Sequence, residues 1–247
     1  ALLSVSLPMN SILLVLSVDD VQSSAHDHLM QIMLVERFFA DVTPAFLERI
    51  NTGNPSSPRN VCGWQGVTCS QDRIVTEIRF CHHQPGNFRL YFLPPTIQTL
   101  ELLDCGQNYQ INVRAFPREL IWLSLLTNKI WGSLDLTALP QKLVSAIFSG
   151  NLLTGPIFLT HLPRTLKRLH VGNNKIDQHT VWYANLPESL TDVRLLTGSH
   201  TNTIEAVRVI SPGIPVRDAK IFRFGGYPVP VDDVVPSYFA RLEDTFA

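Results

Sequence analysis

A regular spacing of prolines constrains this chain more than any other sequence feature. Pro95, Pro117, Pro140, Pro163 and Pro187 follow one another at intervals of 22, 23, 23 and 24 residues. Repetition at such a period is typical of chains in which each copy forms one small unit that cannot bury its apolar row alone. We therefore expect the copies to stack into a solenoid that shares one continuous core.

The copies agree in more than their prolines. They share the pattern LxxLxLxxNxIxGxIxLxxLPxx over 97–119, 120–142, 143–165 and 166–189, with degenerate copies that begin at Val75 and Leu190. Apolar residues at alternate positions predict a short strand with one buried face. The amides of Asn128, Asn151 and Asn174 follow these strands and can satisfy backbone groups of neighbouring turns. The Leu-Pro step closes each turn, because proline disfavours a continuing helix.

This pattern resembles that of the leucine-rich repeat family, and the resemblance covers residues 75–199, about half of the chain. It implies an α/β solenoid, a right-handed superhelix of about five to six coils. Cys105 occupies the position of the asparagines in its copy, and cysteine is the accepted replacement there. The resemblance therefore implies a buried structural ladder of Cys105, Asn128, Asn151 and Asn174, and it makes Cys105 a poor candidate for a nucleophile.

The segment before the first copy reads "VCGWQGVTCS" over 61–70 and follows two predicted helices, 27–42 and 43–50. Thr43 is a plausible helix cap, and Pro44 suits the first helical position. The form C-x-W-x-G-V-x-C resembles the amino-terminal cap of plant-type leucine-rich repeat proteins. Similar caps accompany the short repeats of kinetoplastid protist proteins, which this chain also resembles. In such a cap Trp64 would plug the first coil, and the six-residue separation of Cys62 and Cys69 suits a structural disulfide if the compartment is oxidising.

Metal and redox sites are the alternative readings of these cysteines. A structural zinc site needs four ligands, commonly with C-x₂₋₄-C spacing, and a redox pair needs C-x-x-C. Neither spacing is present, and the nearest candidates, Cys81, His82 and His83, are consecutive residues that do not converge easily. We therefore predict a structural cap, no metal site and no cofactor.

Binding is expected on the concave side of the solenoid, where the strands present alternate side chains outward. An apolar centre within a polar border is typical of a protein–protein hot spot. An alternative is that the chain's own leader or tail covers the apolar centre. The predicted partner-binding residues are Leu103, Trp122, Leu126 and Ile147 at the centre and Arg79, Glu101, Arg168, His170 and Arg194 at the rim.

The two ends do not follow the repeat. Residues 1–25 are apolar and resemble the core of a signal peptide, but they lack basic residues at the start and are interrupted by Pro8 and Asn10. We expect a retained, packed segment there and no membrane span. Residues 235–247 predict a short amphipathic helix within a carboxyl-terminal cap or arm. The expected organisation is a leader (1–25), a helical cap (26–73), the repeats (74–199) and the carboxyl-terminal segment (200–247).

Composition and motifs favour a binding role. The chain carries 20 basic and 21 acidic residues, a balance that argues against nucleic-acid binding. No Ser or acidic residue is placed beside His170 by spacing alone, and no other catalytic constellation is evident, so we do not expect an enzyme.

The first hypothesis is a non-catalytic module that binds one or more protein partners. The alternative is a structural subunit of a large assembly, anchored by its leader and its carboxyl-terminal arm. The sequence contains no N-x-[ST] acceptor, which favours the subunit over a glycosylated receptor ectodomain. A bonded Cys62–Cys69 pair would instead favour an oxidising, secretory compartment. The sequence leaves the compartment open.

Overall fold

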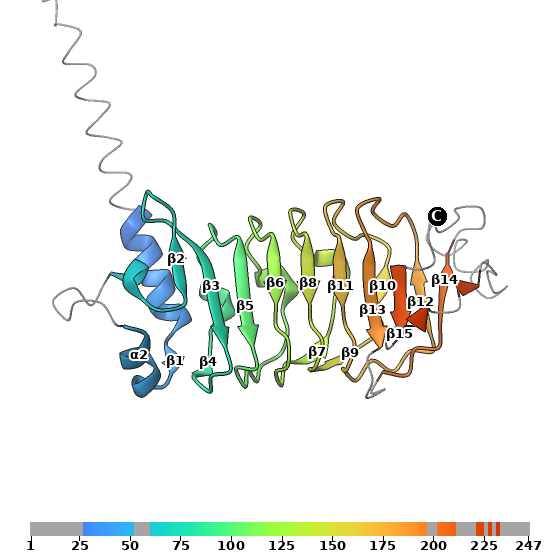
Figure 1. Ribbon diagram of the computed structural model, residues 1–247, viewed down its shortest axis with the longest axis horizontal. Helices are drawn as coiled ribbons and strands as arrows, with labels where there is room; N and C mark the ends of the chain where they lie inside the picture. Colours follow the sequence, from blue (N-terminus) through green and yellow to red (C-terminus); the bar gives the residue numbers. More distant parts are fainter. Residues whose placement is uncertain are drawn as a thin grey trace, which may run out of the picture.

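The computed structural model describes residues 27–51, 60–196, 202–210, 221–224, 227–228 and 231–232, with side chains described as far as Phe222. The described chain forms an elongated body in which successive strands lie side by side along the long axis (Figure 1). This is the stacked solenoid that the proline period predicts.

One nine-stranded sheet runs the length of the body. The strands of the repeat are parallel neighbours in sequence order, and an antiparallel strand lies at each end of the sheet. In spatial order the strands are β2 (Val67–Cys69), β3 (Val75–Cys81), β5 (Thr99–Leu103), β6 (Trp122–Ser124), β8 (Ser145–Ile147), β11 (Arg168–His170), β13 (Asp192–Leu196), β15 (Phe222–Phe224) and β16 (Tyr227–Pro228).

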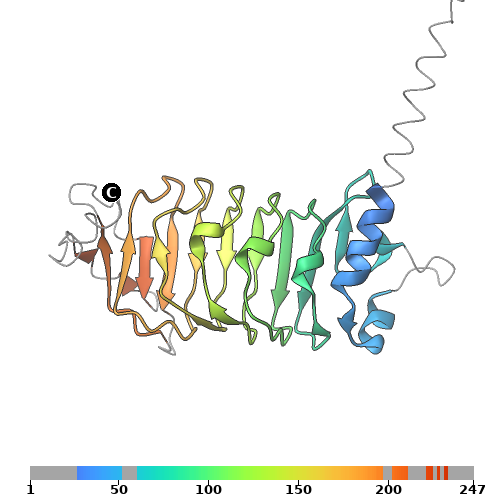
Figure 2. The ribbon, with the colours of Figure 1, turned by 180° about the vertical axis from the view of Figure 1, so that it is seen from behind.

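The opposite side of the body is built from tight turns and short strands (Figure 2). In two turns a side chain, Asn112 or Asp135, accepts a hydrogen bond from the backbone two residues later and so starts a 3₁₀ helix. The elements on this side are η2 (Leu90–Phe92), η3 (Val113–Ala115), η4 (Leu136–Ala138), the paired strands β7 (Trp131–Ser133) and β9 (Leu152–Thr154), and the sheet of β10 (Phe158–Leu159), β12 (Thr180–Tyr183), β14 (Ala206–Val209) and β17 (Val231–Asp232).

The core consists of apolar rows that run perpendicular to the strands. Each strand contributes inward side chains that stack on those of the next turn, as the alternating pattern predicts. No single turn could exclude water from both sides of such a row, so stacking is what creates the core. One fully buried row comprises Ile78, Leu100, Leu123, Ala146, Leu169, Val193 and Phe222.

A ladder of asparagines ties consecutive turns together. The Nδ2 atom of Asn151 donates to the carbonyl oxygens of Leu125 and Phe148, at 2.8 and 3.0 Å, and its Oδ1 accepts from the Ile130 amide at 3.1 Å. Asn128 and Asn174 make the corresponding contacts in their own turns. The Cys105 Sγ lies 3.3 Å from the Phe80 carbonyl oxygen, in the place of an asparagine amide.

The amino-terminal cap covers the first turn. A helix over 27–38 and α2 (Pro44–Ile50) flank η1 (Val61–Gly63), and Cys62 is bonded to Cys69, as predicted. The first helix ends before residue 42 because β1 (Asp41–Val42) pairs with β4 (Gly86–Asn87). Gly66 has φ +85°, and a side chain there would collide with the Arg79 carbonyl oxygen, which explains the glycine of the cap motif.

Polar and aromatic contacts join this cap to the repeats. The Gln31 side chain accepts from the Val75 amide at 2.7 Å and donates to the Arg73 carbonyl at 3.0 Å, so it occupies backbone groups at the end of the stack. Phe39 lies at the centre of an aromatic cluster. Its members are Phe38, Phe39, Phe46, Trp64, Phe80 and Phe88.

The sheet continues beyond the repeats that the sequence makes evident. β15 pairs in parallel with β13, so the segment after residue 199 supplies a further strand of the same sheet. The predicted leader (1–25) and the predicted helix over 235–247 lie outside the described residues. Within the described part of the chain, no helix is both long enough and apolar enough to cross a bilayer.

Candidate functional site

The outward face of the nine-stranded sheet brings most of the predicted partner-binding residues together. Parallel pairing places residues of equivalent position in two rows across the strands. The first row is Glu77, Thr99, Trp122, Ser145, Arg168 and Asp192, and the second is Arg79, Glu101, Ser124, Ile147, His170 and Arg194. A third row begins with Cys81 and Leu103, and the Asp104 amide bonds the Leu126 carbonyl on the next turn.

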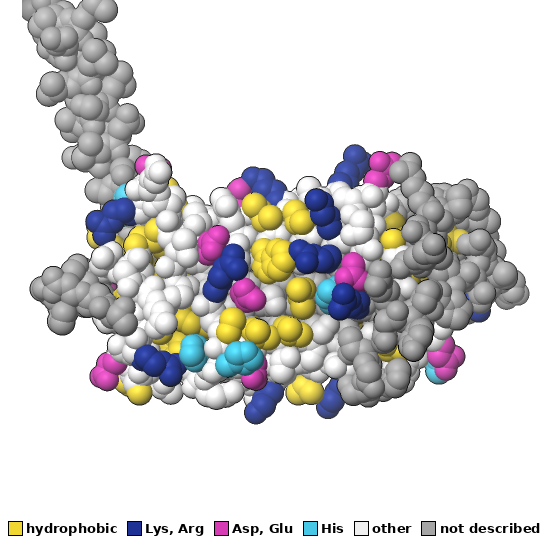
Figure 3. Space-filling model, viewed as in Figure 1, with side chains coloured by type: hydrophobic (Ala, Val, Ile, Leu, Met, Phe, Trp, Pro, Cys, Tyr) yellow, Lys and Arg dark blue, Asp and Glu magenta, His cyan; other side chains and the backbone are white. Residues whose placement is uncertain are grey.

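Apolar side chains occupy the middle of this face. Leu103, Trp122, Leu126 and Ile147, here called the Trp122 patch, are each half-buried. The Arg168 guanidinium carbon lies 4.5 Å from the centre of the Trp122 ring, a cation–π contact. Figure 3 shows apolar side chains at the centre of the face with basic and acidic groups around them.

Two polar atoms at the patch have no hydrogen-bond partner among the described residues. They are the Nε1 of Trp122 and the Oγ of Ser145, both buried. The two residues are neighbours in the first row. Buried polar groups are nearly always paired, since leaving one unpaired costs about 1–3 kcal/mol. Two adjacent exceptions distinguish this part of the face from the fully satisfied ladder inside the solenoid.

Charged side chains flank the patch on the β3–β5 side. The Arg79 Nε lies 3.1 Å from Glu77 Oε2, and its Nη1 lies 3.5 Å from Glu101 Oε2. Arg79 is half exposed, so these ion pairs are screened by water and contribute little to stability. The groups therefore remain available to a partner's charges.

A second charged cluster lies on the β11–β13 side. The His170 Nε2 is 2.8 Å from Asp192 Oδ2, and the Arg194 Nη2 is 3.2 Å from the same oxygen. Spacing along the sequence places no acidic residue beside His170, but strand pairing brings Asp192 to it. The two residues occupy different rows on adjacent strands, and their side chains meet on the diagonal, where long side chains still reach one another.

Burial and neighbouring charges set the protonation of this cluster. Burial lowers the pKa of His170, the hydrogen bond with Asp192 opposes that effect, and Arg194 and Arg168 reinforce it, with a net lowering. For Asp192, burial raises the pKa, but hydrogen bonds from His170 and Arg194 outweigh it and lower the pKa overall. The cluster therefore holds an ionised carboxylate beside a histidine that is neutral at neutral pH.

We expect the stability contributed by His170 to fall in mild acid. Because its folded-state pKa lies below the ordinary value of 6.5, the unfolded chain binds the proton first. The contribution is therefore complete above pH 6.5 and is lost as pH falls toward the folded-state pKa. Urea unfolding of the wild type and of His170→Gln at pH 7.5, 6.5 and 5.5 should show the wild-type advantage shrinking with acidity. An advantage that grows in acid would contradict this assignment, and the other histidines cancel in the comparison.

The cluster and the free thiols do not assemble a nucleophilic site. Among the described residues, no serine, threonine or cysteine side chain hydrogen-bonds His170. Burial raises the pKa of Cys81, and it raises that of Cys105 to about 11, so both thiols are protonated at neutral pH. The part of the chain with described positions also holds no group of three or more His, Cys, Asp or Glu residues arranged for a metal ion.

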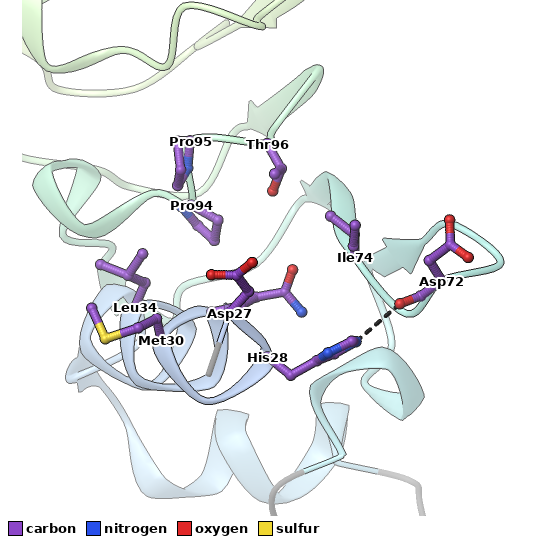
Figure 4. Close-up of a pocket in the computed structure, with 10 residues that line it drawn as sticks. Asp27, His28, Met30, Leu34, Asp72, Ile74, Pro94, Pro95 and Thr96 are labelled. Carbon is purple, nitrogen blue, oxygen red and sulfur yellow. Dashed lines mark hydrogen bonds between the residues drawn. The ribbon is translucent and has the colours of Figure 1, made fainter. Parts of the chain in front are cut away.

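A separate groove of about 570 Å³ lies at the cap end of the solenoid, between the helix over 27–38 and the first turn. Figure 4 shows Leu34, Pro94 and Pro95 forming apolar walls, with the Asp27 carboxylate between the helix and the turn. The His28 Nε2 bonds the Asp72 carbonyl oxygen at 2.9 Å. The groove is thus lined by two carboxylates, those of Asp27 and Asp72, and by a histidine engaged with the backbone.

Comparison with known proteins gives structural neighbours only. No protein-family model matches the chain, and no curated protein matches it. The BIR2 ectodomain of Arabidopsis thaliana superposes with a TM-score of 0.50 and 19% identity, covering 70% of this chain and 93% of that one. The BIR3–SERK2 complex from the same plant superposes with a TM-score of 0.50 and 20% identity, covering 70% of this chain and 93% of that one. Pollen Receptor Kinase 3 superposes with a TM-score of 0.50 and 20% identity, covering 71% of this chain and 84% of that one. At these identities the likeness concerns the fold alone.

Proposed function

Starting from the premise that the chain is a leucine-rich repeat solenoid, we propose that it is a non-catalytic protein-binding module that takes its partner on the outward sheet face. The observation that carries the proposal is the Trp122 patch, four apolar side chains on adjacent turns that stay half exposed. Interfaces concentrate binding energy in such aromatic and aliphatic centres, which a polar rim shields from water.

The rim residues have a different role from the patch. Arg79, Glu101 and Arg194 lie around the apolar centre with the largely buried His170, and these three charges orient a partner more than they hold it, because exposed charges contribute mainly to specificity and association rate. Arg168 is already held over Trp122, so less side-chain freedom is lost when a partner covers it. The solved complex named for BIR3 and SERK2 gives this proposal support from a protein with the same fold.

We also propose that the cap is related to plant-type leucine-rich repeat caps and that the protein resides in an oxidising compartment. The bonded Cys62–Cys69 pair around the buried Trp64 supports kinship of the cap with plant-type caps and, through the short repeats, with kinetoplastid proteins. A disulfide of this kind also supports an oxidising compartment.

The test is a comparison of two double variants with matched chemistry. Trp122→Asp with Leu126→Asp places charge in the patch, and we expect partner recovery to fall by at least thirtyfold, about 2 kcal/mol. Trp131→Asp with Leu152→Asp places the same charges on β7 and β9, where these side chains are 46% and 37% exposed and adjacent in register.

The measurement is recovery of partner proteins by the immobilised full chain, quantified by mass spectrometry, with thermal unfolding as the check on folding. Proteins that bind the sheet face should be lost with the first variant and retained with the second. Equal recovery by the wild type and the Trp122 variant would exclude the sheet face as the binding site.

A further inference from the structure

The charges around the Trp122 patch are divided between two poles of opposite sign. On the β3–β5 side, Glu77 and Glu101 contribute two carboxylates against the single guanidinium of Arg79, a net charge of −1. On the β11–β13 side, Arg168 and Arg194 contribute two guanidiniums against the carboxylate of Asp192, a net charge of +1. His170 adds no charge while it is neutral.

The strands between the poles carry no charge in these two rows. β6 and β8 present Trp122, Ser124, Ser145 and Ile147. An apolar contact therefore separates the negative pole from the positive pole. A partner that buries the apolar contact must bring its own groups against both poles, and like charges placed together at an interface are strongly unfavourable.

We infer that the sheet face selects a polypeptide segment that carries a basic side chain and an acidic side chain on either side of an apolar one. This inference rests on the proposed function of the face and names the chemistry of its partner. The apolar side chain covers the Trp122 patch, the basic group lies toward Glu77 and Glu101, and the acidic group lies toward Arg168 and Arg194.

Strand spacing gives the separation of the two charges. Neighbouring strands lie about 4.8 Å apart. Glu101 on β5 is therefore three strand spacings, about 14 Å, from Arg168 on β11, and four spacings, about 19 Å, from Arg194 on β13. An extended segment that crosses the strands advances about 3.4 Å per residue. Its acidic and basic residues should therefore be about four to six positions apart, with the apolar residue between them.

The test uses a library of random nonapeptides displayed on phage and selected on the immobilised full chain. For the wild type, we expect sequences with one base and one acid four to six positions apart around an apolar residue. These should be enriched at least tenfold over sequences whose two charges have the same sign. Thermal unfolding of each variant below checks that it is folded.

Two single charge reversals change the expected selection in opposite ways. Glu101→Lys makes the negative pole +1, so both poles become positive and peptides with two acids should be selected. Arg194→Glu makes the positive pole −1, so peptides with two bases should be selected. Arg194 is 48% exposed and Arg168 retains its contact with Trp122, so the second reversal leaves the patch intact.

The outcomes separate this inference from the function on which it rests. Selection that depends on Trp122 but shows no opposite-charge pair, or that does not change with either reversal, would overturn the inference and leave the sheet face as the binding site. Absence of enrichment by the wild type would also overturn it. Selection undiminished by Trp122→Asp with Leu126→Asp would overturn the proposed function itself.

Discussion

Replacing Asn151 by aspartate should lower the free energy of unfolding by about 4 kcal/mol. The substitution puts a carboxylate oxygen where Nδ2 now donates to the carbonyl oxygens of Leu125 and Phe148, at 2.8 and 3.0 Å. An uncompensated buried charge costs about 3–5 kcal/mol. Asn151 is buried at 5% exposure, and its hydrogen-bond partners among the described residues are all backbone groups. Protonation would restore a donor, so the loss should be smaller at low pH.

Asn151→Ala separates the loss of hydrogen bonds from the effect of charge. Alanine leaves the buried Ile130 amide without its acceptor and should cost about 2–3 kcal/mol. Lys129→Ala, at an exposed neighbouring position, is the matched control and should change stability by less than about 0.5 kcal/mol. Urea unfolding at pH 7.5 measures all three. An aspartate variant as stable as the Lys129 control would show that the ladder does not hold the turns together.

Replacing Phe39 by alanine should have an effect of similar size at the other end of the molecule, about 4 kcal/mol. Its ring is 1% exposed and lies 5.0 Å from Phe38, 5.2 Å from Trp64 and 5.4 Å from Phe88, measured between ring centres. Three of these contacts are edge-to-face, so the loss includes aromatic interactions as well as a cavity. The cap would then detach from the first turn before the rest of the stack unfolds, since each turn is stabilised by its neighbours.

The control for this prediction is Phe158→Ala, because Phe158 is 40% exposed and its removal leaves no internal cavity. In a background with Trp122, Trp131 and Trp182 replaced by phenylalanine, Trp64 fluorescence reports on the cap, and far-ultraviolet circular dichroism reports on the whole body. In Phe39→Ala the fluorescence transition should move to lower urea concentration than the circular dichroism transition. Coincident transitions with a loss comparable to that of Phe158→Ala would mean that the aromatic cluster does not anchor the cap.

The ladder shows how far periodicity predicts this fold. Asn128, Asn151 and Asn174 are 23 residues apart and were predicted from the repeat alone. Asn202 continues the ladder, accepting from the Asn174 and Ile176 amides and donating to the Val171 carbonyl. It follows Asn174 by 28 residues, so an alignment of fixed period misses it. A search that allowed five extra residues in one turn would have found it.

The sheet face shows what periodicity leaves undetermined. Alternation along each strand decides which side chains point outward, and the two rows around Trp122 follow from that alternation. The pattern does not decide how long side chains turn once they are there. The stacking of Arg168 on Trp122 and the diagonal contact of His170 with Asp192 depend on side-chain length and rotamer. Likewise, nothing in the spacing of the cap indicates that Gln31 reaches the Val75 amide.

Because the sheet gains one parallel strand per turn, distances along it change only in fixed steps. Each turn advances the sheet by about 4.8 Å, so the two poles can be moved apart or together only in steps of that size. Gain or loss of a whole turn between β5 and β11 would leave the apolar rows and the asparagine ladder in phase. It would nevertheless change the distance between the negative and positive poles by about 4.8 Å, which is a little more than the length of one residue in an extended partner segment. Divergence in partner choice could thus proceed by changes in turn number, without altering a single contact residue.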